Sequence, residues 1–251
     1  LVGSEMCIRD SPNPAALLNL PDVKVFYEPS DKSKLYLKRK SHFGGNLSIS
    51  YKDPVMVVRG WRHHLFDEWG RPYLDAYNNV PHVGHAHPRL ADIAKDQMRR
   101  VNTNTRYLHT AQTEFAKILL AKFPKEFEVC YFVNSGSEAN ELALRLARAH
   151  SKNMGIITPD HGYFGNTTGA LQISAYKFNK PNGIGQSDWV ELVDVADDFR
   201  GAYGRDDPDR ASKFADLIDG ALDRLTSKGH GLCGFIAETF PSVGGQIIPP
   251  K

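Results

Sequence analysis

The chain has 251 residues, of which 41% are hydrophobic and 24% are charged, a balance typical of globular proteins that bury a sizeable core. Its formal net charge of +2 predicts neither a dedicated nucleic-acid surface nor a membrane surface. No apolar run approaches the roughly 20 residues that cross a bilayer, and the first residues do not read as a signal peptide. The cysteines, Cys7, Cys130 and Cys233, are far apart and odd in number, which indicates reduced thiols and a cytoplasmic protein.

The amino-terminal part divides into a segment without a clear pattern, residues 1–52, and an orderly small-domain segment, residues 53–107. Within the first, the charged stretch 30–40 is expected to be solvated. In the second, short apolar runs predict a small antiparallel sheet, followed by a helix that starts at Pro88. The expected strands are 55–59, 63–67 and 73–76, with a turn at 67–71, and the expected helix is 90–101.

Residues 108–251 alternate strand and helix patterns, which predicts an α/β fold with a mainly parallel sheet and helices on both faces. Two polar, glycine-containing connections interrupt the pattern at 181–188 and 196–208. The expected strands are 129–133, 155–158 and 234–238, and the expected helices are 112–123, the run from Ser135 to His150, and 210–228 closed by Gly229.

The central stretch is 133–140, where the strand expected at 129–133 turns into a helix. Ser135 and Glu138 have the spacing of a capping box, and Gly136 leaves room for a ligand near the backbone. The first helical amides then point outward unpaired, which makes the turn a possible phosphate site. The alternative is an ordinary capped helix. The residues expected to form the helix's apolar face are Ala139, Leu142, Ala143 and Leu146.

Ligands of parallel sheets bind at the carboxyl ends of the strands, where the loops after 133, 158 and 238 are expected to meet. Tyr163 and Phe164 lie between two glycines in the second loop. Paired aromatic residues are often core, but this setting also suits a flat ring placed against a flat ligand. Glu238 at the end of an apolar strand needs partners and therefore marks a candidate site.

Two further polar stretches permit a functional and a structural interpretation. His82, His85 and His87 permit a zinc site, although no nearby carboxylate or cysteine completes a ligand set; the alternative is a loop with hydrogen-bonding histidines. Residues 102–107 form either a solvated connection or a substrate-facing loop with Arg106 as an anion receptor.

Together these residues resemble the class III aminotransferase family, the fold type I enzymes that use pyridoxal phosphate. The resemblance covers roughly residues 54–250 and rests on several motifs in order. Within the family the similarity is greatest to the phospho-lyases that act on phosphoethanolamine or phosphohydroxylysine. The family motifs are 84–88, 134–140, 161–167 and 237–238, and the narrower match uses 77–85, 102–109, 173–178 and 241–250.

The resemblance implies a role for each candidate residue. Gly136 and Ser137 would hold the cofactor phosphate, Tyr163 would stack on the pyridine ring, and Glu238 would order the pocket behind the cofactor. On the substrate side the resemblance points to Asn78 and Arg106. Phe164 departs from these phospho-lyases, which tend to have histidine there.

The same resemblance implies that the chain is truncated, because the lysine that forms the Schiff base and the acid on the pyridine nitrogen lie beyond Lys251 in the family. Neither Lys177 nor Lys180 is placed to substitute for that lysine. We therefore expect part of the large cofactor-binding domain in residues 108–251, without turnover by itself.

The expected activity is elimination of phosphate from a small phosphorylated amine. One alternative is a transaminase that passes the amine to a keto acid; another is a non-enzymatic regulatory or metal-binding α/β module. Family membership further implies a homodimer for the complete protein.

Overall fold

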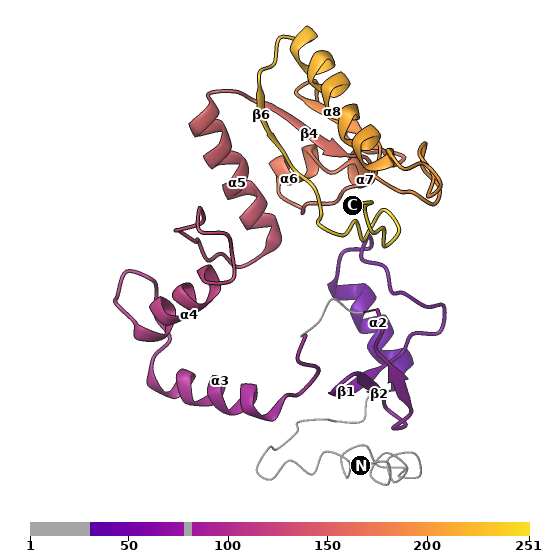
Figure 1. Ribbon diagram of the computed structural model, residues 1–251. Helices are drawn as coiled ribbons and strands as arrows, with labels where there is room; N and C mark the ends of the chain where they lie inside the picture. Colours follow the sequence, from indigo (N-terminus) through magenta and orange to yellow (C-terminus); the bar gives the residue numbers. More distant parts are fainter. Residues whose placement is uncertain (1–30, 78–81) are drawn as a thin grey trace. The chain divides into compact units, whose positions relative to one another are not determined.

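The computed structural model describes residues 31–77 and 82–251, and the chain divides into two compact units, residues 1–109 and residues 110–251. Figure 1 colours the chain from indigo to yellow along its length. Among the described residues, no helix combines the length and apolar character that crossing a bilayer requires.

The first unit contains the small antiparallel sheet expected from the sequence. Its strands are β1 (Val57–Trp61), β2 (His64–Asp67) and β3 (Pro72–Leu74), and they pair in the order β1-β2-β3. Both neighbouring pairs are antiparallel, as successive strands joined by short turns require.

The turn between β2 and β3 is organised around Asp67, whose side chain is buried. Its carboxylate accepts hydrogen bonds from the amides of Trp69 and Arg71, from Arg71 Nε and from the Tyr73 hydroxyl. Burial would raise the pKa of Asp67, but these donors lower it below its ordinary value. Asp67 therefore remains ionised and fixes the turn that the sequence placed at 67–71.

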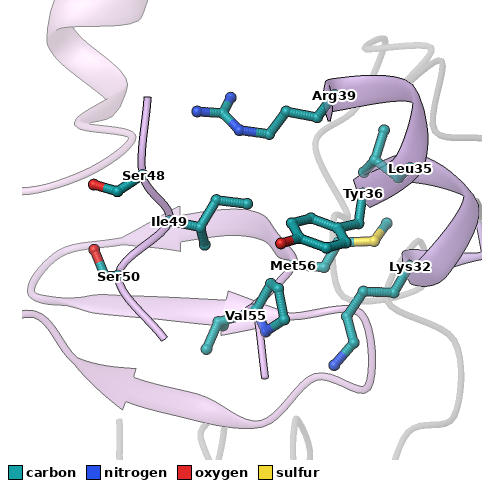
Figure 2. A pocket seen from close by; sticks show the side chains of 10 residues that line it. Lys32, Leu35, Tyr36, Arg39, Ser48, Ile49, Ser50, Val55 and Met56 are labelled. Atoms are coloured by element: carbon teal, nitrogen blue, oxygen red, sulfur yellow. The ribbon is translucent and has the colours of Figure 1, made fainter. Parts of the chain in front are cut away.

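The described part of the first unit also contains two helices. α3 (Pro88–Arg100) begins at the proline that predicted it. α2 (Lys32–His42) was missed, since its charged stretch was expected only to be solvated; it is capped by Asp31 and buries no side chain. Between α2 and residues 48–56 lies a cavity of about 350 Å³, where Tyr36 and Ile49 project toward one another (Figure 2). None of the predicted site residues lines this cavity.

The second unit contains a parallel sheet with β4 (Gly155–Pro159) at its centre, flanked by β5 (Val190–Val193) and β6 (Leu232–Phe235). The parallel arrangement confirms the predicted fold class. β6 begins and ends earlier than the predicted strand 234–238. β5 was missed because it has only four residues and carries Glu191 in its interior, which weakens the apolar signal.

Adjacent residues of β4 face opposite layers, as the twofold repeat of a strand requires. Ile156 packs in a cluster with Leu144, Phe164, Ile173 and Val190. Ile157 packs in a second cluster whose buried members are Val193, Ala221 and Leu225.

Helices cover both faces of this sheet, as predicted. α5 (Gly136–Ser151) contributes Leu144 to the first cluster, and α8 (Arg210–Ser227) contributes its apolar side to the second, so the two lie on opposite sides of β4 (Figure 1). The remaining helices of the unit are α4 (Thr110–Leu120), α6 (Thr168–Gln172) and α7 (Ala175–Phe178). The sequence did not predict α6 or α7, which are too short to show a helical repeat.

Of the predicted apolar face of α5, Leu142 is half-buried, but the other three residues are exposed. The side chain that α5 buries is Leu144, while Leu146 is 47% exposed and Ala139 and Ala143 are also exposed. The face directed at the rest of the unit instead carries polar residues such as Asn140, whose side chain binds the backbone of a loop. Periodicity identified an apolar stripe, but this stripe is not the one that packs against the sheet.

The strand expected at 129–133 is also not formed. In the described chain no strand lies beside this segment, so its backbone lacks the ladder partner that a strand needs. Val129 is exposed, and Phe132 stacks on Phe115 of α4 with ring centroids 5.2 Å apart.

Candidate functional site

The amino terminus of α5 is capped by the two residues predicted to cap it. The Ser135 hydroxyl accepts a hydrogen bond from the amide of Glu138 at 3.1 Å. Glu138 Oε2 accepts from the amide of Asn134 at 2.6 Å, one residue further back than in a standard capping box. The cap therefore occupies the amides of Asn134 and Glu138.

The cap leaves the amides of Gly136 and Ser137 without a hydrogen-bond acceptor among the described residues. Among the hydrogen bonds between described residues, neither amide is a donor. A side chain added at Gly136 would meet nothing within 4 Å, so the backbone there borders open space. These amides also lie at the positive end of the α5 dipole, an arrangement that suits an anion such as phosphate.

The loop that follows β4 lies directly against this helix terminus. Ser137 Oγ accepts a hydrogen bond from the amide of Asn166 at 3.0 Å, and Asn140 Nδ2 donates to the carbonyl of Phe164 at 2.7 Å. Further along the loop, the Thr167 hydroxyl donates to Glu141 Oε2 at 2.7 Å. Three polar residues of α5 therefore fix the loop in place.

Gly165 permits this close approach. Its φ of +133° disfavours any residue with a side chain, and a Cβ atom there would lie 2.5 Å from Ser137 Oγ and 2.7 Å from Ser137 Cα. The sequence predicted a loop bounded by glycines but not the contact with Ser137. The contact joins residues 28 positions apart, which no local pattern reveals.

The paired aromatic residues have different environments. Phe164 is buried in the core cluster of β4, β5 and α5, and its amide donates to the Ser174 hydroxyl at 2.9 Å. Tyr163 is half-buried, and its ring meets that of Tyr176 edge-on with centroids 6.1 Å apart. Phe164 therefore follows the core interpretation, whereas Tyr163 keeps part of its surface exposed.

Glu238 lies in the loop after β6, three residues beyond the end of the strand, and is half-buried. Glu238 Oε2 accepts from the amide of Ser242 at 2.7 Å, and Oε1 accepts from the amide of Tyr163 over a longer 3.4 Å. The carboxylate thus connects the two loops, as expected of an acid that needs partners.

These contacts bring together the residues predicted to bind the cofactor. Gly136 and Ser137 begin α5, Ser137 holds the loop that carries Tyr163, and Tyr163 meets Glu238. The site therefore combines free amides at a helix terminus with an aromatic ring and a carboxylate. Such a set of groups fits a ligand with a phosphate and a flat ring.

The two residues predicted for the substrate side are not part of this set. Asn78 lies outside the described residues. Arg106 belongs to the first unit, in a turn where its amide donates to Asn104 Oδ1 at 3.0 Å. Its role as an anion receptor stays a prediction.

The histidine-rich stretch makes contacts of its own. His85 Nε2 lies 2.6 Å from Asp75 Oδ2, and the backbones of His85 and Arg62 exchange hydrogen bonds. Asp75 lies ten residues before His85 in the chain, and the sequence alone did not identify it as the carboxylate partner of this histidine. Within residues 31–77 and 82–251, no three His, Cys, Asp or Glu side chains form a group that could hold a metal ion.

Comparison with known proteins identifies the family of the chain. The model of the family described as Aminotransferase class-III matches residues 49–251. A protein of Drosophila melanogaster named alanine–glyoxylate aminotransferase 2-like is 40% identical over 230 residues, which are 90% of this chain and 47% of the relative. A Caenorhabditis elegans protein named ethanolamine-phosphate phospho-lyase homolog 1 is 35% identical over 241 residues, 92% of this chain and 51% of the relative.

A solved structure agrees with these matches. A phospholyase from Arthrobacter, in complex with phosphoethanolamine, superposes with a TM-score of 0.76 at 37% identity, covering 86% of this chain and 50% of that one. The chain thus spans about half the length of the curated relatives it matches.

Proposed function

Because the chain belongs to the class III aminotransferase family, whose enzymes depend on pyridoxal phosphate, we propose that its second unit carries the cofactor-binding part of such an enzyme. The observation that supports this most strongly is the pair of free amides at Gly136 and Ser137, next to open space and to the loop of Tyr163. A phosphate needs such donors, and a pyridine ring needs such an aromatic partner.

In this proposal the α5 terminus and the Ser137 hydroxyl hold the phosphate of the cofactor, and Tyr163 holds its ring. Glu238 accepts a hydrogen bond from the Tyr163 amide. It thereby fixes the backbone that carries the Tyr163 ring and so the position of this ring against the cofactor. When bound, pyridoxal phosphate supplies an electron sink for negative charge at the carbon that carries the amine. The residues of this chain position the cofactor.

The reaction that we propose for the whole protein is elimination of phosphate from a small phosphorylated amine such as phosphoethanolamine. The names of the C. elegans and Arthrobacter proteins support it. The name of the Drosophila relative supports the alternative, a transaminase. Phosphate release without a keto acid would identify the lyase, and amine transfer that requires a keto acid would identify the transaminase.

We further propose that the complete protein is a homodimer and that the 251-residue chain does not turn over substrate by itself. The test of the second point is borohydride reduction in the presence of pyridoxal phosphate, followed by peptide mass spectrometry. We expect scattered, substoichiometric labelling of lysines. Stoichiometric labelling of Lys251 would contradict the proposal, since Lys251 would then be the cofactor's lysine.

The cofactor site is tested with pyridoxine 5′-phosphate, which has the ring and phosphate of the cofactor but no aldehyde and therefore cannot react with lysines. We expect the chain to bind it and Ser137→Ala to weaken binding by roughly tenfold, because one hydrogen bond to a charged phosphate is lost. Ser227→Ala is the control, since that hydroxyl donates to the Arg224 carbonyl near the end of α8. Equal affinity of Ser137→Ala and the unchanged chain, measured by calorimetry, would contradict the site.

A further inference from the structure

Two lysines lie against the rings of Tyr163 and its neighbour Tyr176. Lys177 Nζ lies 5.3 Å from the ring centroid of Tyr163 and 5.6 Å from that of Tyr176, and Lys180 Nζ lies 3.6 Å from the Tyr176 centroid. The amide of Tyr176 donates to the carbonyl of Gly162 at 3.2 Å, which holds α7 against the loop of Tyr163. The lysines therefore belong to the same rim as the candidate cofactor site.

Neither lysine is neutralised by an acid. Among the ion pairs of the described residues, none includes Lys177 or Lys180. The nearby carboxylates have other partners: Asp160 accepts from the His161 amide and lies 3.2 Å from His161 Nδ1, while Glu238 accepts from two backbone amides. Lys180 also lowers the pKa of the Tyr176 hydroxyl, first through a hydrogen bond and then through its charge.

We propose that Lys177, in α7 beside Tyr163, and Lys180, two residues after α7 and over the ring of Tyr176, form the receptor for the phosphate group of the substrate. This inference rests on the proposed function, because it takes the Tyr163 loop as one wall of the cofactor site. It assigns the two phosphates to different places: the cofactor phosphate to the amides of Gly136 and Ser137, and the substrate phosphate to the two lysines.

Charge matching favours a phosphate monoester over a carboxylate at this receptor. A phosphate monoester carries a charge of about −1.5 to −2 at neutral pH, and two ammonium groups balance it. A lysine binds phosphate as a compact point charge with three rotatable donors, and here the aromatic faces of Tyr163 and Tyr176 restrict where those charges lie. A carboxylate, with a single charge, would gain less from the pair.

The test uses ethyl phosphate, which has the two-carbon chain and phosphate of phosphoethanolamine but no amine. It is titrated into the 251-residue chain with and without saturating pyridoxine 5′-phosphate and followed by ³¹P NMR. We expect Lys177→Gln to weaken ethyl phosphate binding roughly tenfold and Lys180→Gln about threefold, because each removes a charge-assisted contact. Lys177→Arg retains the charge and is expected to stay within about threefold of the unchanged chain.

Lys152→Gln is the matched control. Lys152 is exposed and lies at the opposite end of α5, about 24 Å along the helix from Gly136. Its substitution is expected to leave ethyl phosphate binding unchanged. The far-ultraviolet circular dichroism of each variant confirms that it folds.

The inference is overturned if the chain does not bind ethyl phosphate, or if the double variant of Lys177 and Lys180 binds it as the unchanged chain does. Pyridoxine 5′-phosphate binding in the same samples separates the two proposals. If pyridoxine 5′-phosphate binds but the lysine substitutions leave ethyl phosphate affinity unchanged, the proposed substrate receptor is wrong and the cofactor site is not affected. If ethyl phosphate binding depends on the lysines while pyridoxine 5′-phosphate does not bind, the cofactor site fails, and the assignment of the lysines to the substrate of that site is overturned with it.

Discussion

Gly165 sets the distance between the Tyr163 loop and α5. We expect Gly165→Ala to lower the free energy of unfolding by about 1–3 kcal/mol, because its φ of +133° is strained for alanine and the new methyl group would meet Ser137. The displaced loop should also weaken pyridoxine 5′-phosphate binding. Urea unfolding followed by fluorescence and a calorimetric titration measure the two effects.

Gly204→Ala is the control for that substitution. A Cβ atom at Gly204 would meet nothing within 4 Å, so a methyl group there is expected to change stability by less than about 0.5 kcal/mol. Equal stability of the two variants would show that the loop does not approach Ser137 as closely as described.

At the scale of single residues, the sequence identified the chemistry of the site better than its contacts. The cap of Ser135 and Glu138 and the glycine at 136 follow from local spacing, because a helix terminus is organised within a few residues. The bond between Ser137 and Asn166, and the long bond between Tyr163 and Glu238, join distant positions. No single-sequence pattern contains that information.

At the scale of elements, the orientation of α5 is open to a direct test. We expect Leu144→Ala to cost about 2–4 kcal/mol of unfolding free energy, because Leu144 is 3% exposed and packs against β4 and β5. Leu146→Ala, on the face that periodicity favoured, is expected to cost less than about 1 kcal/mol, because Leu146 is 47% exposed. If chemical denaturation gave the opposite order, the predicted face would be the packed one.

An ion-pair cluster joins β5 to α8 and gives the second unit a pH dependence. Glu191 is buried and accepts hydrogen bonds from Lys228 and from Arg224 Nε. Burial would raise the pKa of Glu191, but Lys228 and Arg224 hold it below its ordinary value of 4.5. Since that pKa is lower in the folded chain than in the unfolded chain, the stabilisation is present above pH 4.5 and is lost as the pH falls below it.

We therefore expect Glu191→Gln to cost about 1–2 kcal/mol at pH 7, a modest value because both cationic partners are partly exposed to water. The difference in unfolding free energy between Glu191→Gln and the unchanged chain should be smaller at pH 3.5 than at pH 7. Urea unfolding at the two pH values measures it, with the exposed Glu126→Gln as the control. A cost that is the same at both pH values would rule out ionisation of Glu191 as the cause.

Prediction of helices and strands from the sequence succeeded where the hydrophobic pattern was long or where proline, glycine or a turn residue marked its ends. α3 starts at its proline, α8 ends just before Gly229 with φ of +83°, and the turn at Asp67 closes the small sheet. It failed at β5, because the buried Glu191 in this strand is paired with Arg224 of α8 and not with residues near it in the sequence. It also failed at 129–133, where an apolar run needs a strand partner as well as a propensity.

At the scale of the whole molecule, the second unit combines the parallel sheet with the candidate cofactor residues, and the first unit carries Arg106. The family match runs across both units, from residue 49 to 251. Composition and element order were enough to predict the α/β class, because alternating strands and helices allow few other arrangements.

The most direct test of the account is a crystal structure of the chain with pyridoxine 5′-phosphate. We predict that the phosphate lies within about 3 Å of the Gly136 and Ser137 amides, with the pyridine ring against Tyr163. A phosphate bound elsewhere, or a ring that does not contact Tyr163, would contradict the central claim that the α5 terminus and the loop after β4 form one cofactor site.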